Sequence, residues 1–219
     1  PFFDDLSNNP DEIDAFLNEQ ITLNNIDSKR PKNPQDIVLY GFGRIGRLMA
    51  RMLVQTTGPG NYFRLKAVVV RKTGDNDLVK RASLLRRDSV HGRFDGTIRV
   101  DVENELLVVN GNPVKFIYAS SPSDVKYEDF GIKSPIVIDN TGIWRDETDL
   151  SQHLACGASK VILTAPAKGD IRNIVFGVND SALQESDNII SAASCTTNAI
   201  VPVLKLISDN YGIANGHIE

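Results

Sequence analysis

One cysteine stands where a predicted strand gives way to a predicted helix. Cys195 follows the strand pattern of residues 188–192 and precedes the apolar-periodic run 199–207. The N–H groups and the positive dipole end at a helix start stabilise a thiolate, which is the nucleophilic form of cysteine. The adjacent hydroxyls of Ser194 and Thr196 are donors for an oxyanion or a phosphate. We therefore predict a nucleophile, against the alternative of a small residue buried at a strand-to-helix turn.

A glycine-rich turn forms a second candidate site. Residues 41–46 read G-F-G-R-I-G and follow the predicted strand 36–40, which is the context of the G-x-G-x-x-G nucleotide fingerprint. In that fingerprint Gly41 makes a tight turn, Gly43 lets backbone approach a pyrophosphate, and Gly46 lets the following helix pack on the strand. The alternative is a set of glycines that only turn a loop.

The residues after the second predicted strand indicate which nucleotide would bind. NAD sites carry an acid at the end of this strand, which holds the ribose 2′-hydroxyl. Here the predicted strand 63–71 ends with Arg71 and Lys72, and the nearest acid, Asp75, lies beyond a glycine. Cations attract a 2′-phosphate, so this pattern favours NADP over NAD. In the alternative interpretation both are solvated strand-end charges.

The elements that must position these sites alternate between strand and helix. This order predicts an α/β fold with a doubly wound, mostly parallel sheet. From residue 97 to 118 the apolar period changes to two, with a hairpin signal at Asn110-Gly111, which predicts a small antiparallel insertion. The other predicted strands are 135–139, 160–164, 173–178 and 188–192, and the predicted helices are 44–55, 77–87, 123–130 and 146–156.

Composition excludes several classes of protein. The 219 residues are 41% hydrophobic, with a net charge of −4 and no long basic run, so we expect no nucleic-acid partner. No apolar stretch approaches the ~18 residues of a membrane span, and no signal pattern begins the chain, which predicts a cytoplasmic protein without a membrane partner. The two cysteines fit a reducing compartment, and Cys156 is interpreted as structural. We assign no metal ligands.

Taken together, the motifs resemble those of phosphorylating glyceraldehyde-3-phosphate dehydrogenases, from about Asp36 to the last residue. The resemblance implies a Rossmann cofactor domain over 35–194, the start of a catalytic domain over 195–219, and a homotetramer when complete. Residues 1–34 are then an N-terminal extension with a short helix. The motifs that carry the resemblance are Gly41 to Arg47, Arg87 to Gly92, Asn140-Thr141-Gly142, Thr164-Ala165-Pro166 and Ala193 to Asn198.

The resemblance also implies a reaction of glycolysis or gluconeogenesis. The Cys195 thiolate attacks a small phosphorylated aldehyde, hydride passes to the nicotinamide of NAD or NADP, and inorganic phosphate releases an acyl phosphate. Ser194 and Thr196 correspond to residues that help hold inorganic phosphate. The implied cofactor residues are Arg44 and Ile45 at the pyrophosphate, Thr141 and Gly142 beside the cofactor, Trp144 near the adenine edge and Thr164 near the nicotinamide ribose. An ordinary core or surface aromatic is the alternative for Trp144.

Some residues depart from the family pattern. Tyr40 replaces an asparagine, Arg71-Lys72 replaces Asn-Asp, and Ser120-Ser121 replaces Arg-Asp. The last two concern the adenosine end and put a preference for NAD in doubt.

The catalytic histidine of the family is expected beyond Glu219. His91 and His153 are interpreted as structural or surface residues, so we expect the isolated chain to have little phosphorylating activity. The alternatives are a dehydrogenase of erythrose 4-phosphate or another semialdehyde, and a nucleotide-binding module without turnover.

Overall fold

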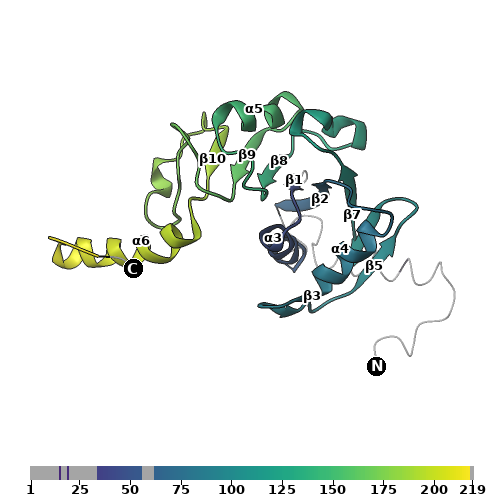
Figure 1. Ribbon diagram of the computed structural model, residues 1–219, viewed down its shortest axis with the longest axis horizontal. Coiled ribbons are helices and arrows are strands. Elements are labelled where there is room, and N and C mark those ends of the chain that lie inside the picture. The colour runs from purple at the N-terminus through teal and green to yellow at the C-terminus, as the bar shows by residue number, and fades with distance from the viewer. Residues whose placement is uncertain (1–14, 16–18, 20–33, 56–61, 218–219) are drawn as a thin grey trace.

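Within the part of the chain that the structure describes, an eight-stranded sheet forms the centre (Figure 1). The computed structural model describes residues 15, 19, 34–55 and 62–217, so the predicted helix of the N-terminal extension lies almost entirely outside the described residues. In spatial order the strands are β10 (Ile189–Ser191), β9 (Lys160–Leu163), β8 (Ile136–Asp139), β1 (Gln35–Tyr40), β2 (Phe63–Val70), β7 (Asn112–Tyr118), β6 (Leu106–Val109) and β5 (Ile98–Asp101).

The sheet is doubly wound about β1. This strand pairs in parallel with β2 on one side and with β8 on the other, and β8, β9 and β10 continue in parallel. The chain first extends the sheet on the β2 side and then returns to the β8 side. Such a reversal opens a crevice at the carboxyl ends of the strands, where ligands bind in open α/β sheets. The predicted fold class is confirmed.

The predicted antiparallel insertion is continuous with the main sheet. β7 pairs in parallel with β2 and antiparallel with β6, which in turn pairs with β5. The hairpin between β6 and β7 turns at Asn110 and Gly111, both with positive φ, as a two-residue turn of type I′ requires. An additional pair joins β3 (Arg87–Asp88) to β4 (Gly92–Arg93).

Helices cover both faces of the sheet (Figure 1). α3 (Arg44–Gln55) and α4 (Asp77–Arg86) share one buried cluster with Leu39 and Val68, whereas Val38 and Val69, their neighbours in sequence, belong to a cluster on the opposite face. α5 (Glu147–Ala155) lies on that second side. α6 (Cys195–Tyr211) follows β10 and projects from the sheet, and it buries none of its side chains against the described residues. The described residues include no helix that is long and apolar enough to cross a membrane.

Two predicted elements are wrong. The predicted strand 173–178 makes only one bridge, between Asn173 and Ser191, because Asn179 accepts a hydrogen bond from the Val175 amide and folds the segment into a turn. This turn leads into the short helix η3 (Asp180–Ala182). The predicted helix 123–130 is instead two 3-10 helices, η1 (Pro122–Asp124) and η2 (Tyr127–Phe130).

The break between η1 and η2 has a packing reason. Val125 and Lys126 adopt extended backbone angles there. This conformation places Val125 and Tyr127 in the core, where both are almost fully buried.

Candidate functional site

The glycine turn after β1 leads directly into α3. Gly41 has φ of +92°, and a Cβ there would lie 2.9 Å from Thr141 Cγ2. A Cβ on Gly46 would lie 2.4 Å from the Gly41 carbonyl oxygen, so the helix approaches the turn more closely than any side chain allows. A Cβ on Gly43 would meet nothing within 4 Å. The turn is therefore closed on its protein side and open at Gly43.

A pocket of about 630 Å³ opens at this turn. Its volume falls in the ~300–1,000 Å³ range of small-molecule sites, and its place at the carboxyl ends of β1, β2, β7 and β8 is the crevice that the topology creates. Of the predicted cofactor residues, Gly41, Gly43, Arg71, Thr141 and Trp144 line the pocket, whereas Arg44, Ile45, Gly46, Gly142 and Thr164 do not.

Trp144 and Thr164 hold different places beside the pocket. Trp144 lines it and also packs, partly buried, against two core clusters, so both interpretations of this residue describe part of its surroundings. The Thr164 hydroxyl donates to the Asp139 carbonyl oxygen at 3.1 Å, which ties β9 to β8 behind the pocket wall.

A buried carboxylate shapes one wall of the pocket. Asp139, at the end of β8, is fully buried, and its Oδ1 accepts hydrogen bonds from the Thr141 amide at 2.7 Å and the Thr141 hydroxyl at 2.6 Å. Its Oδ2 lies 3.4 Å from Nε2 of His153, which is also fully buried. Asp139 was not among the predicted site residues, although an acid ending a strand just before a loop motif is a signal that the sequence contains.

Two tyrosines complete this buried group. The Tyr127 hydroxyl lies 3.3 Å from Nδ1 of His153, and the Tyr40 ring packs edge-on against the His153 ring with centroids 4.7 Å apart. Burial, followed by the charge of Asp139, raises the pKa of Tyr40 well above its ordinary value. Tyr40, which lines the pocket, is therefore neutral. The buried position of His153 fits a structural role, one of the two roles predicted for it.

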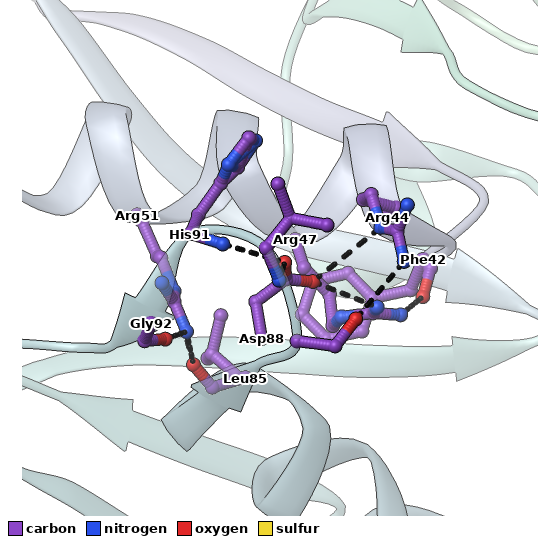
Figure 2. Close-up of polar contacts among 10 residues, drawn as sticks. Phe42, Arg44, Arg47, Arg51, Leu85, Asp88, His91 and Gly92 are labelled. Carbon is purple, nitrogen blue, oxygen red and sulfur yellow. Dashed lines mark hydrogen bonds and ion pairs between the residues drawn. The ribbon is translucent and has the colours of Figure 1, made fainter.

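Arginine side chains of α3 hold the segment that follows α4 (Figure 2). Arg44 lies 3.7 Å from the Asp88 carboxylate and donates to Ser89, so its side chain is committed to this segment. Arg47 lies 3.5 Å from Asp88 and donates to the Phe42 carbonyl oxygen, although its own Nε lacks a partner among the described residues. These contacts fix the start of α3 and leave the backbone of the helix start facing outward.

Two further contacts secure the same segment. Arg51 donates two hydrogen bonds to the Leu85 carbonyl oxygen and one to the Gly92 carbonyl oxygen (Figure 2). Asp88 Oδ1 accepts from the amides of Val90 and His91. The motif Arg87 to Gly92, which contributed to the family resemblance, therefore anchors α3, the helix that follows the glycine turn.

The contacts of the Asp88 carboxylate make the stability of the fold depend on pH. The amides of His91 and Val90, and then the charge of Arg44, lower the pKa of Asp88 to about 2 from an ordinary value near 4. A lowered folded pKa adds stability above the unfolded pKa that is lost as the pH falls through the folded pKa. We expect Asp88→Asn to unfold more easily than the wild type at pH 6, with the difference shrinking as the pH falls from about 4 towards 2. Denaturant unfolding at stepped pH measures it, and a difference independent of pH would contradict the assignment.

Cys195 is the first residue of α6. Ser194 caps the helix, because its hydroxyl accepts from the Thr197 amide at 2.9 Å. Ala193, directly before the cap, has φ of +60°, a left-handed conformation that costs energy in a residue other than glycine. Cys195 is exposed, and so is Thr196. The predicted helix-start position of the cysteine is confirmed.

Cys195 and the glycine turn lie at the same edge of the sheet. β10 and β1 run in parallel, so the residues that follow them emerge at the common carboxyl edge. Three strand spacings of about 4.8 Å separate these two strands, or roughly 14 Å along the edge. Within the described residues, no group of three or more His, Cys, Asp or Glu side chains is arranged to hold a metal ion.

The switch point beside β1, the glycine turn and the pocket define a Rossmann-type dinucleotide-binding domain. A family model described as glyceraldehyde 3-phosphate dehydrogenase, NAD binding domain, matches residues 35–147. The chain therefore belongs to the glyceraldehyde 3-phosphate dehydrogenase family.

Several relatives are similar over most of this chain. A glyceraldehyde-3-phosphate dehydrogenase-like protein of Pseudomonas aeruginosa is 60% identical over 185 residues, covering 84% of this chain and 40% of that protein. Glyceraldehyde-3-phosphate dehydrogenases of Thermotoga maritima and Zymomonas mobilis are 37% and 38% identical, each over 82% of this chain and 51% of the relative. The chain thus spans about half, or less, of the length of these curated relatives.

Proposed function

We propose that this chain supplies the cofactor site and the nucleophile of a phosphorylating glyceraldehyde-3-phosphate dehydrogenase. The observation that carries the proposal is a cysteine at a capped helix start on the same sheet edge as an open glycine turn. The names of the relatives support the choice of substrate. By the same resemblance the complete protein is a cytoplasmic homo-oligomer, and residues from 195 onward begin a second domain. The exposed apolar side chains of α6, such as Val203 and Leu206, are consistent with that division.

The chemistry begins at Cys195. Its thiolate attacks the aldehyde carbon, and the backbone N–H groups of the helix start stabilise the oxyanion that forms. A bound nicotinamide cofactor would supply the acceptor for the hydride that leaves this thiohemiacetal oxyanion, and its loss would leave a thioester on Cys195. Inorganic phosphate, held by Ser194 and Thr196, then attacks the thioester, which releases an acyl phosphate and restores the Cys195 thiolate. Ser194 already uses its hydroxyl as a helix cap, so Thr196 is the less encumbered of the two.

The residues of the pocket fit a dinucleotide. The backbone from Gly41 to Ile45 would hold the pyrophosphate at the open side of Gly43, where a Cβ has no neighbour within 4 Å. Arg71 lines the pocket, and its side chain makes no hydrogen bond or ion pair with another described residue. The positive charge of Arg71 at the end of β2 attracts a 2′-phosphate, so we propose NADP as the preferred cofactor over NAD.

The cofactor proposal is tested with the only tryptophan of the chain. Because Trp144 lines the pocket, we expect NAD and NADP each to change its fluorescence, with NADP binding more tightly at one ionic strength. Arg71→Asp should weaken NADP by about tenfold or more and affect NAD much less, since it reverses a charge beside the phosphate. Tighter binding of NAD would contradict the preference, and the lack of binding by either nucleotide would contradict the proposed function.

The nucleophile proposal predicts a ranking of two thiols. Cys195 is exposed at a helix start, whereas Cys156 is half-buried at the C-terminal end of α5. We expect iodoacetamide at neutral pH to modify Cys195 before Cys156. Mass spectrometry of the two cysteine-containing peptides measures the two rates. Cys195→Ser should leave only the slow reaction. Equal rates at the two cysteines would count against a stabilised thiolate.

A further inference from the structure

A second arginine lines the pocket beside Arg71. Arg81 comes from α4, and its side chain is 16% exposed. Its Nη2 donates to the Arg71 carbonyl oxygen at 2.9 Å, which joins α4 to the end of β2. Two arginines from separate elements therefore line the pocket at the end of β2, where this fold holds the adenosine ribose.

Lys72, the other cation of this strand end, is directed elsewhere. Its Nζ lies 5.4 Å from the centre of the Tyr118 ring, and Lys72 is not among the residues that line the pocket. The pair of cations expected from the sequence, Arg71 and Lys72, is therefore replaced in the structure by Arg71 and Arg81.

An acid forms an ion pair with Arg81. Asp77 is 3% exposed, and its Oδ2 lies 2.6 Å from the Nε of Arg81, while its Oδ1 accepts a hydrogen bond from the Thr73 hydroxyl. Burial by itself raises the pKa of Asp77, but the hydrogen bonds from Arg81 and Thr73 outweigh burial and lower it. Asp77 thus stays ionised, and each of its oxygens accepts a hydrogen bond.

The position of Asp77 matters for nucleotide choice. Asp77 contacts two residues that line the pocket, Thr73 and Arg81, but it does not itself line the pocket, so it is not placed to accept a ribose 2′-hydroxyl. Its charge instead offsets that of Arg81.

We propose that Arg81 and Arg71 together form the binding site for the 2′-phosphate of NADP, and that Asp77 limits its strength by neutralising Arg81. This inference rests on the proposed nucleotide-binding function. Arginine suits the task because its planar fork binds phosphate oxygens in pairs. The phosphate would share Arg81 with Asp77, so the acid sets how strongly NADP is preferred.

The test compares substitutions with opposite expected effects. Calorimetric titration with NAD and with NADP, at one ionic strength, is applied to the unsubstituted 219-residue chain, Arg81→Gln, Asp77→Asn and the control Lys72→Gln. We expect Arg81→Gln to weaken NADP about tenfold with little change for NAD. Asp77→Asn should tighten NADP by about threefold or more, because a negative charge near the phosphate is removed. Lys72→Gln should change the ratio of the two affinities less than about twofold.

The opposite expected effects of Arg81→Gln and Asp77→Asn on NADP affinity distinguish this role from a purely structural one. If the Asp77–Arg81 pair only stabilised the fold, both substitutions would weaken both nucleotides alike. Arg81→Lys serves as a second variant should Arg81→Gln fail to fold, and we expect it to weaken NADP severalfold, since lysine keeps the charge but loses the fork.

Two kinds of result would overturn the inference. An unchanged ratio of NADP to NAD affinity in the Arg81 variants, or weaker NADP binding in Asp77→Asn, would overturn this inference alone. If the unsubstituted chain bound neither nucleotide, the inference and the proposed function would fall together.

Discussion

Gly43→Ala should abolish tight nucleotide binding while leaving the protein as stable as the wild type. A methyl group on Gly43 meets no protein atom within 4 Å, so we expect the free energy of unfolding to change by less than about 0.5 kcal/mol. The same methyl group would occupy the space through which a pyrophosphate reaches the helix start, so affinity should fall by about a hundredfold or more. Calorimetric titration and denaturant unfolding measure the two quantities separately.

Gly46→Ala is the matched control, because we expect its main effect on stability rather than on the space for the ligand. Its Cβ would stand 2.4 Å from the Gly41 carbonyl oxygen, and backbone on both sides resists movement. We expect a loss of about 3 kcal/mol in the free energy of unfolding, the upper range for overpacking. If Gly43→Ala bound nucleotide as well as the wild type, the open side of the turn would not be the ligand side.

Asp139→Ala should destabilise the fold and impair the pocket together. It removes the acceptor of the Thr141 amide, the Thr141 hydroxyl and the His153 ring, all facing a fully buried position. Each buried group left without a partner costs about 1–3 kcal/mol, so we expect a total loss of about 3–4 kcal/mol. We also expect weaker nucleotide binding, because Thr141 would lose the contact that holds it at the pocket wall.

Two variants serve as controls for this result. Asp139→Asn keeps an oxygen for Thr141 and should cost less than half as much. Asp146→Ala removes the carboxylate that caps α5 outside the pocket and should cost about 1 kcal/mol without altering nucleotide affinity. A stable Asp139→Ala variant with normal affinity would show that the buried group does not position the wall.

Local sequence patterns predicted most of the fold. The apolar runs of β1 and β2 are continuous because both faces of these strands are covered, and α3 has the bounds 44–55 that its pattern predicts. The failures lie where side chains capture the backbone. The run around Val175 has strand-like residues, but Asn179 accepts its amide hydrogen and turns the chain. Propensity carries no information about such a contact.

The site was predictable in part for the same reason. The glycine spacing and the helix-start cysteine are local signals, and both led to correct positions of the backbone. The partner of Arg71 was not predictable, because Arg81 stands ten positions later and reaches the pocket only through the packing of α4. The partnership of Asp139 with His153 likewise depends on how α5 lies against β8.

A crystal structure of the chain with saturating NADP tests the central claim most directly. The account predicts the dinucleotide in the pocket at the carboxyl ends of β1 and β2, with its pyrophosphate at the backbone beside Gly43 and its 2′-phosphate beside Arg71 and Arg81. The nicotinamide should extend along the sheet edge towards Cys195. A dinucleotide bound elsewhere on the protein, or a pocket that stays empty at saturating NADP, would contradict it.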